Sequence, residues 1–253
     1  MVVASIADGN TAAQLWLMQD AHNDQTVLLW DKGNNVLYLS AAQETLSEET
    51  EQALTALLNE QIRPCALAAG RAYFSISTLP PLPRDKAPKP FAAIAPYAID
   101  KLFFRFRGEA PVLAQAPAVA GLHFAPIDHE LLTDPRFANA AEVRGEIGQM
   151  WPAEERFWRN GFGVAALVAE QIVCWCTAEY VSASQCGIGI ATAQAVQQRG
   201  IATATAVRFV REALRRGMTP HWETAAYNVA SLRVAEKVGF TLLEPKVVWA
   251  GQW

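Results

Sequence analysis

The sequence has little cysteine and no long apolar run, and these absences already narrow the class of protein. Four cysteines in 253 residues are too few for the disulfide framework of a small secreted domain. No apolar run approaches the roughly 18 residues that cross a bilayer, since the stretch from Phe162 is interrupted at Glu170. The first residues, MVVASIADGN, carry no Lys or Arg ahead of their apolar stretch, as a secretory signal would. We therefore expect a soluble cytoplasmic protein with no membrane partner.

An excess of positive charge is also missing. The chain has 21 Lys and Arg against 25 Asp and Glu, a formal net charge of -4. A surface that neutralises nucleic-acid phosphates needs the opposite balance, so no nucleic-acid partner is expected. The arginines from Arg208 to Arg216 indicate a solvated helix face, with Arg208 and Glu212 at i,i+4 spacing. Because 51% of the residues are hydrophobic, the chain can bury a substantial core.

No metal site is indicated either. Cys174 and Cys176 are separated by one residue within a predicted strand, which puts both thiols on one face. A zinc site prefers cysteines spaced by two to four residues and a clear fourth ligand. We interpret the two cysteines as buried free thiols.

Length and composition predict two α/β domains. Strand and helix signals alternate over the first hundred residues, beginning with a helix expected from Asn10 to Ala21. A proline-rich stretch follows, which is expected to be a connector or a surface excursion and contains Pro80, Pro81, Pro83, Pro88, Pro90 and Pro96. A second break lies at 114–121, AQAPAVAG. We expect a smaller N-terminal α/β domain with this connector over 1–117 and a second domain over 118–253.

The segment from Gln197 to Thr203 carries the clearest chemical signal. It follows a predicted strand and opens a strong amphipathic helix, 200–216. A helix N-terminus offers unpaired backbone amides and the positive end of a dipole, both of which attract phosphate. Gly200 removes the side chain where a ligand must come close. On these residues alone, an ordinary helix start explains the pattern equally well.

The order of the motifs around this segment resembles the GNAT acetyltransferase superfamily. The pattern Q-x-x-G-x-A at 197–202 is followed by a helix, a strand and N-x-x-S…K-x-G-F over 228–240. The sequences GFG at 161–163, GIGIAT at 187–192 and PHW at 220–222 are similar to the two-domain branch that includes zwittermicin-resistance-type acetyltransferases. The resemblance covers about 157–240. It implies a C-terminal GNAT fold, a mixed and mostly antiparallel central sheet flanked by helices.

The resemblance also implies acetyl-CoA as co-substrate and a site that would hold it. Backbone amides of 198–203 would hold the diphosphate. The strands expected at 186–192 and 220–224 would separate to admit the pantetheine arm, while Asn228 would bind that arm or position the loop. The residues implied in binding are Ile190, Ala191, Thr192, Gln197, Gln198, Arg199, Gly200, Ile201, Ala202, Thr203 and Asn228.

Catalytic groups that the family often has are absent here. The position seven residues after the Asn, often Tyr, is Ala235, and the Glu that usually precedes the I-G-I strand is replaced by Gly187. A later acidic position is Ala191. We take Tyr227 and Glu223 as catalytic candidates, and a structural or surface role is the alternative for each. His221 shares a strand face with Glu223.

Together these features predict an N-acetyltransferase that moves an acetyl group from acetyl-CoA to a small-molecule amine by direct attack. The N-terminal domain and the connector would shape the acceptor side. The alternative is a catalytically degenerate acyl-CoA-binding or sensing protein, and a third reading is a structural partner whose Gly200 loop binds nothing. Acceptor pockets come from variable loops, so the sequence does not name the amine. A homodimer is kept open as the assembly.

Overall fold

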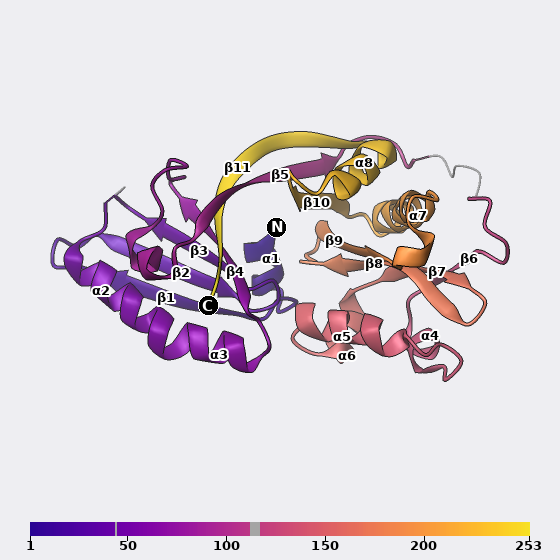
Figure 1. Ribbon diagram of the computed structural model, residues 1–253, viewed down its shortest axis with the longest axis horizontal. Helices are drawn as coiled ribbons and strands as arrows, with labels where there is room; N and C mark the ends of the chain where they lie inside the picture. The colour runs from indigo at the N-terminus through magenta and orange to yellow at the C-terminus, as the bar shows by residue number, and fades with distance from the viewer. Residues whose placement is uncertain (44, 112–116) are drawn as a thin grey trace. The chain divides into compact units, whose positions relative to one another are not determined.

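The chain forms two compact units in the structure, a computed structural model that describes residues 1–43, 45–111 and 117–253 (Figure 1). The larger unit comprises 1–11 and 102–244, and the smaller unit comprises 12–101 and 245–253. The chain passes between the units three times, at 11–12 and along two strands, β5 (Tyr97–Phe106) and β11 (Phe240–Gln252). Each of these strands therefore contributes residues to both units.

This division differs from the expected domains, 1–117 and 118–253. The C-terminal end of β11 returns to the smaller unit, where 249–252 pair antiparallel with 73–76 of β4 (Tyr73–Leu79). The N-terminal residues belong to the larger unit, where the Asn10 amide donates to the carbonyl of Val181 at 3.0 Å. A break in composition does not reveal such returns, because strand pairing and side-chain hydrogen bonds join segments far apart in sequence. The break expected at 114–121 begins outside the described residues.

The proline-rich segment belongs to the smaller unit, where the sequence predicted a connector or a surface excursion, and most residues over 79–86 are exposed. It contains the short 3₁₀ helix η2 (Lys89–Ile94), and Phe91 in that helix is fully buried among the core residues of the unit. Proline excluded regular hydrogen-bonded structure over much of this stretch. Phe91 and the partly buried Ala87 and Ile94 nevertheless attach this part of the segment to the core of the unit.

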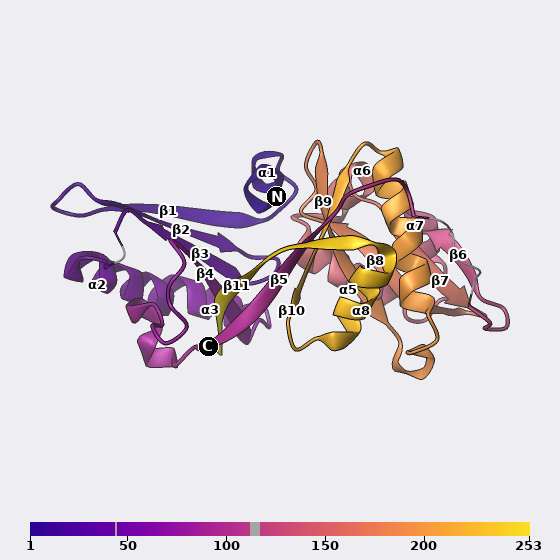
Figure 2. The ribbon, with the colours of Figure 1, turned by 90° about the horizontal axis from the view of Figure 1, so that it is seen from above.

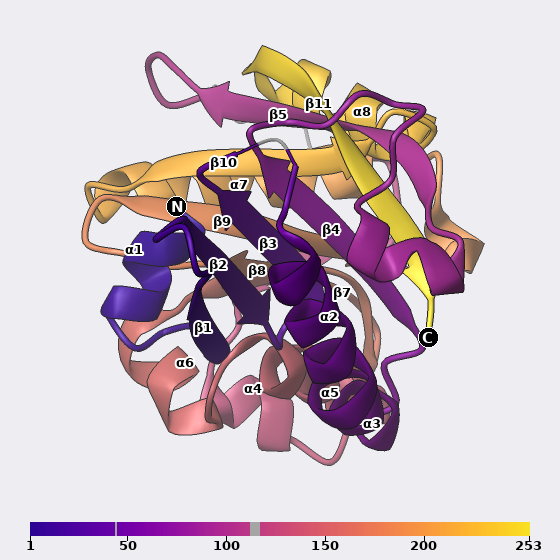
Figure 3. The same cartoon turned by 90° about the vertical axis from the view of Figure 1, so that its left-hand side faces the viewer.

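The smaller unit is a sheet covered by helices. Its strands are β1 (Ala13–Gln19), β2 (Gln25–Asp31), β3 (Val36–Ala41), β4 and the end of β11, in that order. The first three strands form antiparallel pairs, whereas β3 and β4 are parallel. Parallel neighbours need a crossover. It is supplied by α2 (Glu48–Leu57), the π-helical turn η1 (Leu58–Ile62) and α3 (Arg63–Ala68), which lie along the sheet (Figure 3).

The helix expected from Asn10 to Ala21 is wrong, because this segment forms β1. Trp16 and Met18 alternate toward the core, while Leu15 and Leu17 are exposed. An uninterrupted run of apolar residues fits both periods. Pairing of all seven β1 residues with β2 decides in favour of the strand.

The larger unit has the mixed, mostly antiparallel sheet expected from the sequence. Its strands are β6 (His123–Pro126), β7 (Gly163–Val168), β8 (Gln171–Glu179), β9 (Gln185–Thr192) and β10 (Thr219–Ala225). The order is β11-β5-β10-β9-β8-β7-β6. Strands β6 to β9 pair antiparallel and β9 pairs parallel with β10. The unit also contains the N-terminal helix α1 (Val2–Ala7).

Helices cover both faces of this sheet. The helices α4 (His129–Thr133), α5 (Ala140–Met150) and α6 (Glu154–Asn160) lie on one side, and α7 (Ile201–Arg215) and α8 (Val229–Val238) on the other (Figure 1). Helices α7 and α8 lie side by side (Figure 2). No helix in the described ranges is both long enough and apolar enough to cross a membrane.

The sequence explains why α7 forms and where it ends. Ala206, Val210 and Ala213 recur on one face and are fully buried. The helix ends at Gly217, which has a φ of 75°, a left-handed conformation that glycine adopts without strain. Glu212 pairs with Arg215 and Arg216 at 2.7 Å each rather than with Arg208. The Arg208 guanidinium lies over the Phe124 ring, 3.6 Å from its centroid, so its expected pairing with Glu212 is wrong.

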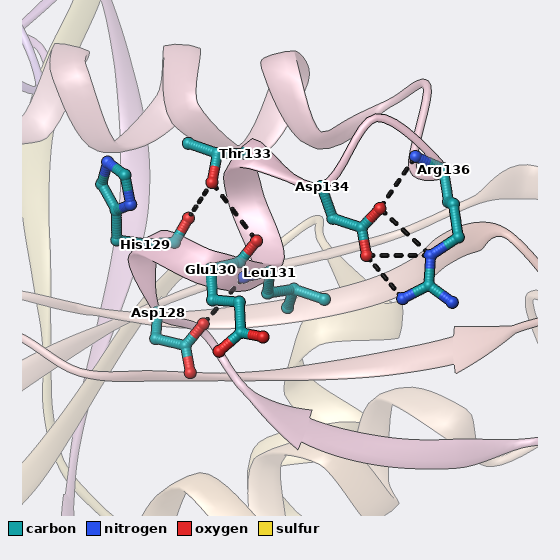
Figure 4. A network of polar contacts seen from close by, with 7 residues as sticks. All are labelled: Asp128, His129, Glu130, Leu131, Thr133, Asp134 and Arg136. Carbon is teal, nitrogen blue, oxygen red and sulfur yellow. Dashed lines mark hydrogen bonds and ion pairs between the residues drawn. The ribbon is translucent and has the colours of Figure 1, made fainter.

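The short helix α4 is defined by side-chain contacts at both ends (Figure 4). The Asp128 carboxylate accepts a hydrogen bond from the Leu131 amide at 2.8 Å, which caps the N-terminus. The Asp134 carboxylate accepts from the backbone amide and guanidinium of Arg136 at the other end. This pair is why the pKa of Asp134 lies below its usual value. These contacts fix the turn between β6 and α5.

Gly163, at the start of β7, is required by close packing. A Cβ there would lie 2.8 Å from Ile127 Cδ1 and 2.9 Å from the Cys176 carbonyl oxygen. We expect Gly163→Ala to lower the free energy of unfolding by about 1–3 kcal/mol, because the backbone must shift to admit a methyl group. Urea unfolding followed by tryptophan fluorescence measures the loss.

The matched control is Gly145→Ala in α5, where an added Cβ meets open space. This variant should gain about 0.5–1 kcal/mol from the higher helix propensity of alanine. Equal urea midpoints for the Gly163 variant and the wild type would show that the packing is looser than described.

Candidate functional site

The loop between β9 and α7 is held in a conformation that few residues adopt. After the short 3₁₀ turn η3 (Gln194–Val196), Gln198 has a φ of 61° and Gly200 a φ of 81°. Both values lie in the left-handed region, which favours glycine. The Gln197 side chain donates to the carbonyl of Thr192 at 3.1 Å and ties the loop to the end of β9. A Cβ at Gly200 would meet its nearest neighbour, Pro117 Cγ, at 3.9 Å, so the space beside this residue is open.

The first turn of α7 presents backbone donors. Gly200 is the N-cap and makes no side-chain cap hydrogen bond, and the Ala204 amide begins the helical pattern by donating to the Gly200 carbonyl at 3.0 Å. The amides of 201–203 therefore have no capping side chain within the described chain. They lie at the positive end of the helix dipole. Such a terminus binds phosphate or another anion.

Beside this helix start, β9 and β10 part. Their register comprises two pairs, Gln185 with Cys186 on β9 against Thr219 with Pro220 on β10, although both strands continue beyond them. The separation expected from the sequence is therefore confirmed. Past the divergence, the Trp222 indole donates to the Ser231 hydroxyl at 2.9 Å and links β10 to α8.

A cavity of about 640 Å³ joins these features. Strand β9, the Gly200 loop, the first turn of α7, Trp222 and helix α8 all contribute to its lining. Most of the binding residues expected from the sequence lie in it: Ile190, Thr192, Gln197, Gln198, Gly200, Ile201, Ala202, Thr203 and Asn228. Their individual roles stay predictions. The Asn228 side chain also caps α8, because its Oδ1 accepts from the Ser231 amide at 3.2 Å.

Two of the expected binding residues do not line this cavity. Arg199 is an exposed residue of the loop. Ala191 lies on the other face of β9, where it borders a separate cavity of about 420 Å³ together with Trp175. Alternation along the strand explains this, because Ile190 and Thr192 point one way and Ala191 the other.

The sequence reading missed the basic side chains that α8 contributes. Arg233 and Lys237 both line the cavity, as do Val229, Ala230 and Val234. Their i,i+4 spacing places the two charges on one helix face, and that spacing was the available signal. The cavity thus combines backbone donors at one helix start with two cations from another helix.

The structure does not bring the two catalytic candidates to the cavity. Tyr227 is 74% exposed in the turn before α8. Glu223 lies on the face of β10 opposite Trp222, as the alternating burial of the strand shows. Ala235, where the family often has Tyr, is fully buried in the core between α7, α8 and β10. Catalytic roles for Tyr227 and Glu223 stay predictions.

His221 lies on the same face of β10 as Glu223. Burial and the positive charge of Arg105 lower the pKa of His221 to about 4. Its Nε2 atom is buried, and no hydrogen-bond partner for it occurs within the described residues. The imidazole is therefore neutral at physiological pH.

Cys174, Cys176 and Cys186 are buried free thiols, which confirms the interpretation of the first two. Burial raises the pKa of each, that of Cys186 to about 12. The described residues contain no group of three or more His, Cys, Asp or Glu side chains that could hold a metal ion.

Comparison with known proteins identifies the family to which this part of the chain is similar. The model of the GNAT acetyltransferase family matches residues 113–248. A curated relative, the uncharacterized N-acetyltransferase YdfB of Bacillus subtilis, is 26% identical over 132 residues. That match spans 52% of this chain and 49% of the relative, so about half the length of each protein is compared.

Two solved structures share the fold at low sequence identity. A GCN5-related N-acetyltransferase-like protein from Streptococcus suis is 15% identical, with a TM-score of 0.62 over 99% of this chain and 93% of that one. A tandem GNAT protein from the clavulanic acid biosynthesis pathway is 15% identical, with a TM-score of 0.53 over 96% of this chain and 83% of that one. At this identity the likeness concerns the fold alone.

The low pKa of His221 predicts a pH dependence of stability. In the unfolded chain His221 takes up a proton below its ordinary pKa of 6.5. In the folded chain it stays neutral until the pH falls to about 4. The free energy of unfolding should therefore fall as the pH drops from 6.5 to 4. Urea unfolding at a series of pH values should show a shallower fall for His221→Gln. The exposed His123→Gln variant should keep the wild-type dependence, and identical profiles for all three proteins would contradict the burial of His221.

Proposed function

The chain belongs to the GNAT acetyltransferase family, and from that premise we propose that it moves an acetyl group from acetyl-CoA to a small-molecule amine. The amine attacks the thioester directly. The observation that carries the proposal is the α7 start without a capping side chain, which opens into the cavity beside the parting strands.

The donors and charges of the cavity suit the diphosphate of acetyl-CoA. The amides of 201–203 supply directed hydrogen bonds and the helix dipole supplies positive potential. Arg233 and Lys237 add full charges from α8. The left-handed Gly200 keeps a side chain away from the approach to these amides. These residues are the ones we expect to hold the nucleotide end of the co-substrate.

The parting of β9 and β10 suits the pantetheine arm. Two strands that stop pairing leave backbone donors and acceptors facing the space between them, and an extended arm with amide groups can use both. Ile190 lines this space from β9 and Trp222 from β10. A backbone amide of β9 could also polarise the thioester carbonyl. Transfer then needs the amine to be held close and its proton to be removed.

A second candidate function is a catalytically degenerate acyl-CoA-binding or sensing protein. The specific observations that favour it are the buried Ala235, which has no hydroxyl to offer, and the exposed position of Tyr227 outside the cavity. Such a protein would bind acetyl-CoA and release no CoA.

Acetyl-CoA binding is tested by isothermal titration. We expect one binding site per chain, and affinity should fall about 2- to 5-fold in Arg233→Ala and in Lys237→Ala, because each removes one exposed charge. Both losses should be smaller with acetyl-pantetheine, which lacks the diphosphate. The matched control is Arg159→Ala, an exposed arginine on α6. No heat of binding at millimolar acetyl-CoA would contradict the proposed site.

Turnover separates the two candidate functions. The wild-type protein is incubated with acetyl-CoA and a panel of primary and secondary amines, and released CoA is measured with a thiol reagent. An acetyltransferase should release CoA only with the amines it accepts, with acetylated amine formed in equal amount. Saturable acetyl-CoA binding without CoA release across the panel would favour the degenerate binding protein.

A further inference from the structure

The carboxylate of Glu179 lies over β9, on the face of the sheet opposite the cavity. Glu179 is the last residue of β8, and in the antiparallel register it pairs with Gly187, while Thr177 pairs with Gly189. Paired residues on neighbouring strands direct their side chains to the same face. Neither β9 position has a side chain. The space above Gly187 is bordered by Tyr180 Cδ2 and Met1 Cε, which would lie 3.2 Å and 3.4 Å from a Cβ there, and the space above Gly189 is bordered by Glu179 and Thr177.

The Glu179 carboxylate fills the place that a side chain at position 189 would take. A Cβ at Gly189 would overlap Glu179 Oε1, and it would lie 3.0 Å from Glu179 Cδ and 3.1 Å from Thr177 Oγ1. The side chain therefore crosses from β8 and lies directly on the β9 backbone. Glycine at position 189 is what makes this placement sterically feasible.

This placement coincides with the point where the strands part. Pairing of β9 with β10 ends at Cys186 and Pro220, one residue before Gly187 and His221. Along β9, the distance from Gly187 to Thr192, which lies beside the Gly200 loop, is about 17 Å at the usual rise per residue of a strand. An extended arm anchored at the loop and lying along β9 would bring its thioester to this region. His221 borders the same face as a neutral group.

Two other carboxylates, those of Glu146 and Glu223, lie on this side of the sheet. Glu146 of α5 accepts a hydrogen bond from the Trp175 indole at 2.7 Å, and burial raises its pKa. Trp175 pairs with Ala191, at the far end of β9 from the divergence. Glu146 thus orients a core tryptophan, whereas Glu179 lies where the strands separate.

We propose that Glu179 is a catalytic residue, which holds the incoming amine and accepts its proton. This inference rests on the proposed function. The amine nitrogen forms a bond to the acetyl carbonyl carbon, the carbon–sulfur bond breaks, and the sulfur leaves with the electron pair as CoA thiolate. The nitrogen becomes acidic as it bonds to carbon, and its proton passes to the Glu179 carboxylate. A carboxylate at this position attracts amines that are cationic in solution. Such an amine loses its ammonium proton to water before it attacks, so that the neutral nitrogen supplies the electron pair.

The test is Glu179→Gln, which keeps the size of the side chain and removes its charge and basicity. With the best amine from the panel, kcat/KM should fall at least about 100-fold, the usual contribution of a general base. The Kd of acetyl-CoA should stay within 2-fold of the wild type. The control is Glu170→Gln in the exposed turn between β7 and β8, which should keep wild-type kinetics. Thermal unfolding of each variant confirms that it is folded.

Gly189→Ala is an independent variant, because its methyl group must displace the carboxylate without altering Glu179. It should also lower kcat/KM while acetyl-CoA still binds. A Glu179→Gln protein that stays within 2-fold of wild-type kcat/KM would overturn the proposal, as would a 100-fold loss confined to Glu223→Gln. Failure of the wild type to bind acetyl-CoA is a different result and would contradict the proposed function itself.

Discussion

What the larger unit offers a ligand depends on one constraint: β9 and β10 pair over two residues and then separate. The pairing fixes where the opening begins, and the separation leaves room for a cavity between the strands, α7 and α8. Buried backbone donors and acceptors require partners, so an opening inside a sheet is costly unless a ligand or water satisfies it. The Trp222–Ser231 hydrogen bond links β10 to α8, and the buried residues of α7 pack against both elements.

Two helix starts of different construction border that opening. Helix α8 is capped by its own Asn228, whose side chain accepts from the Ser231 amide, and it contributes charge through Arg233 and Lys237. Helix α7 begins at a glycine and lacks a capping side chain in the described chain. The second arrangement leaves the amides of 201–203 as directed donors for an anion. The division of roles follows from the residue at each N-cap, Asn in one case and Gly in the other.

Features that depend on the order of neighbouring residues could be predicted from the sequence. Features that depend on contacts between distant segments could not. The Gly200 loop, the separating strands and the buried cysteines follow from motif order and strand alternation. The β1 segment was misread because a continuous apolar run fits two periods. The return of β11 to the smaller unit and the packing around Phe91 leave no mark in composition, since both depend on contacts between distant segments.

Glu179 shows why a motif can lack a group that the folded site contains. A motif specifies only which residue occupies each strand position, and positions 187 and 189 are both glycine. The space above Gly189 is filled from the neighbouring strand, because residues that face each other across two strands share a face and a glycine admits its neighbour's side chain. Chemistry requires a carboxylate at a point in space, whichever strand supplies it. Strand register therefore carries information about the site that position-by-position comparison of motifs does not contain.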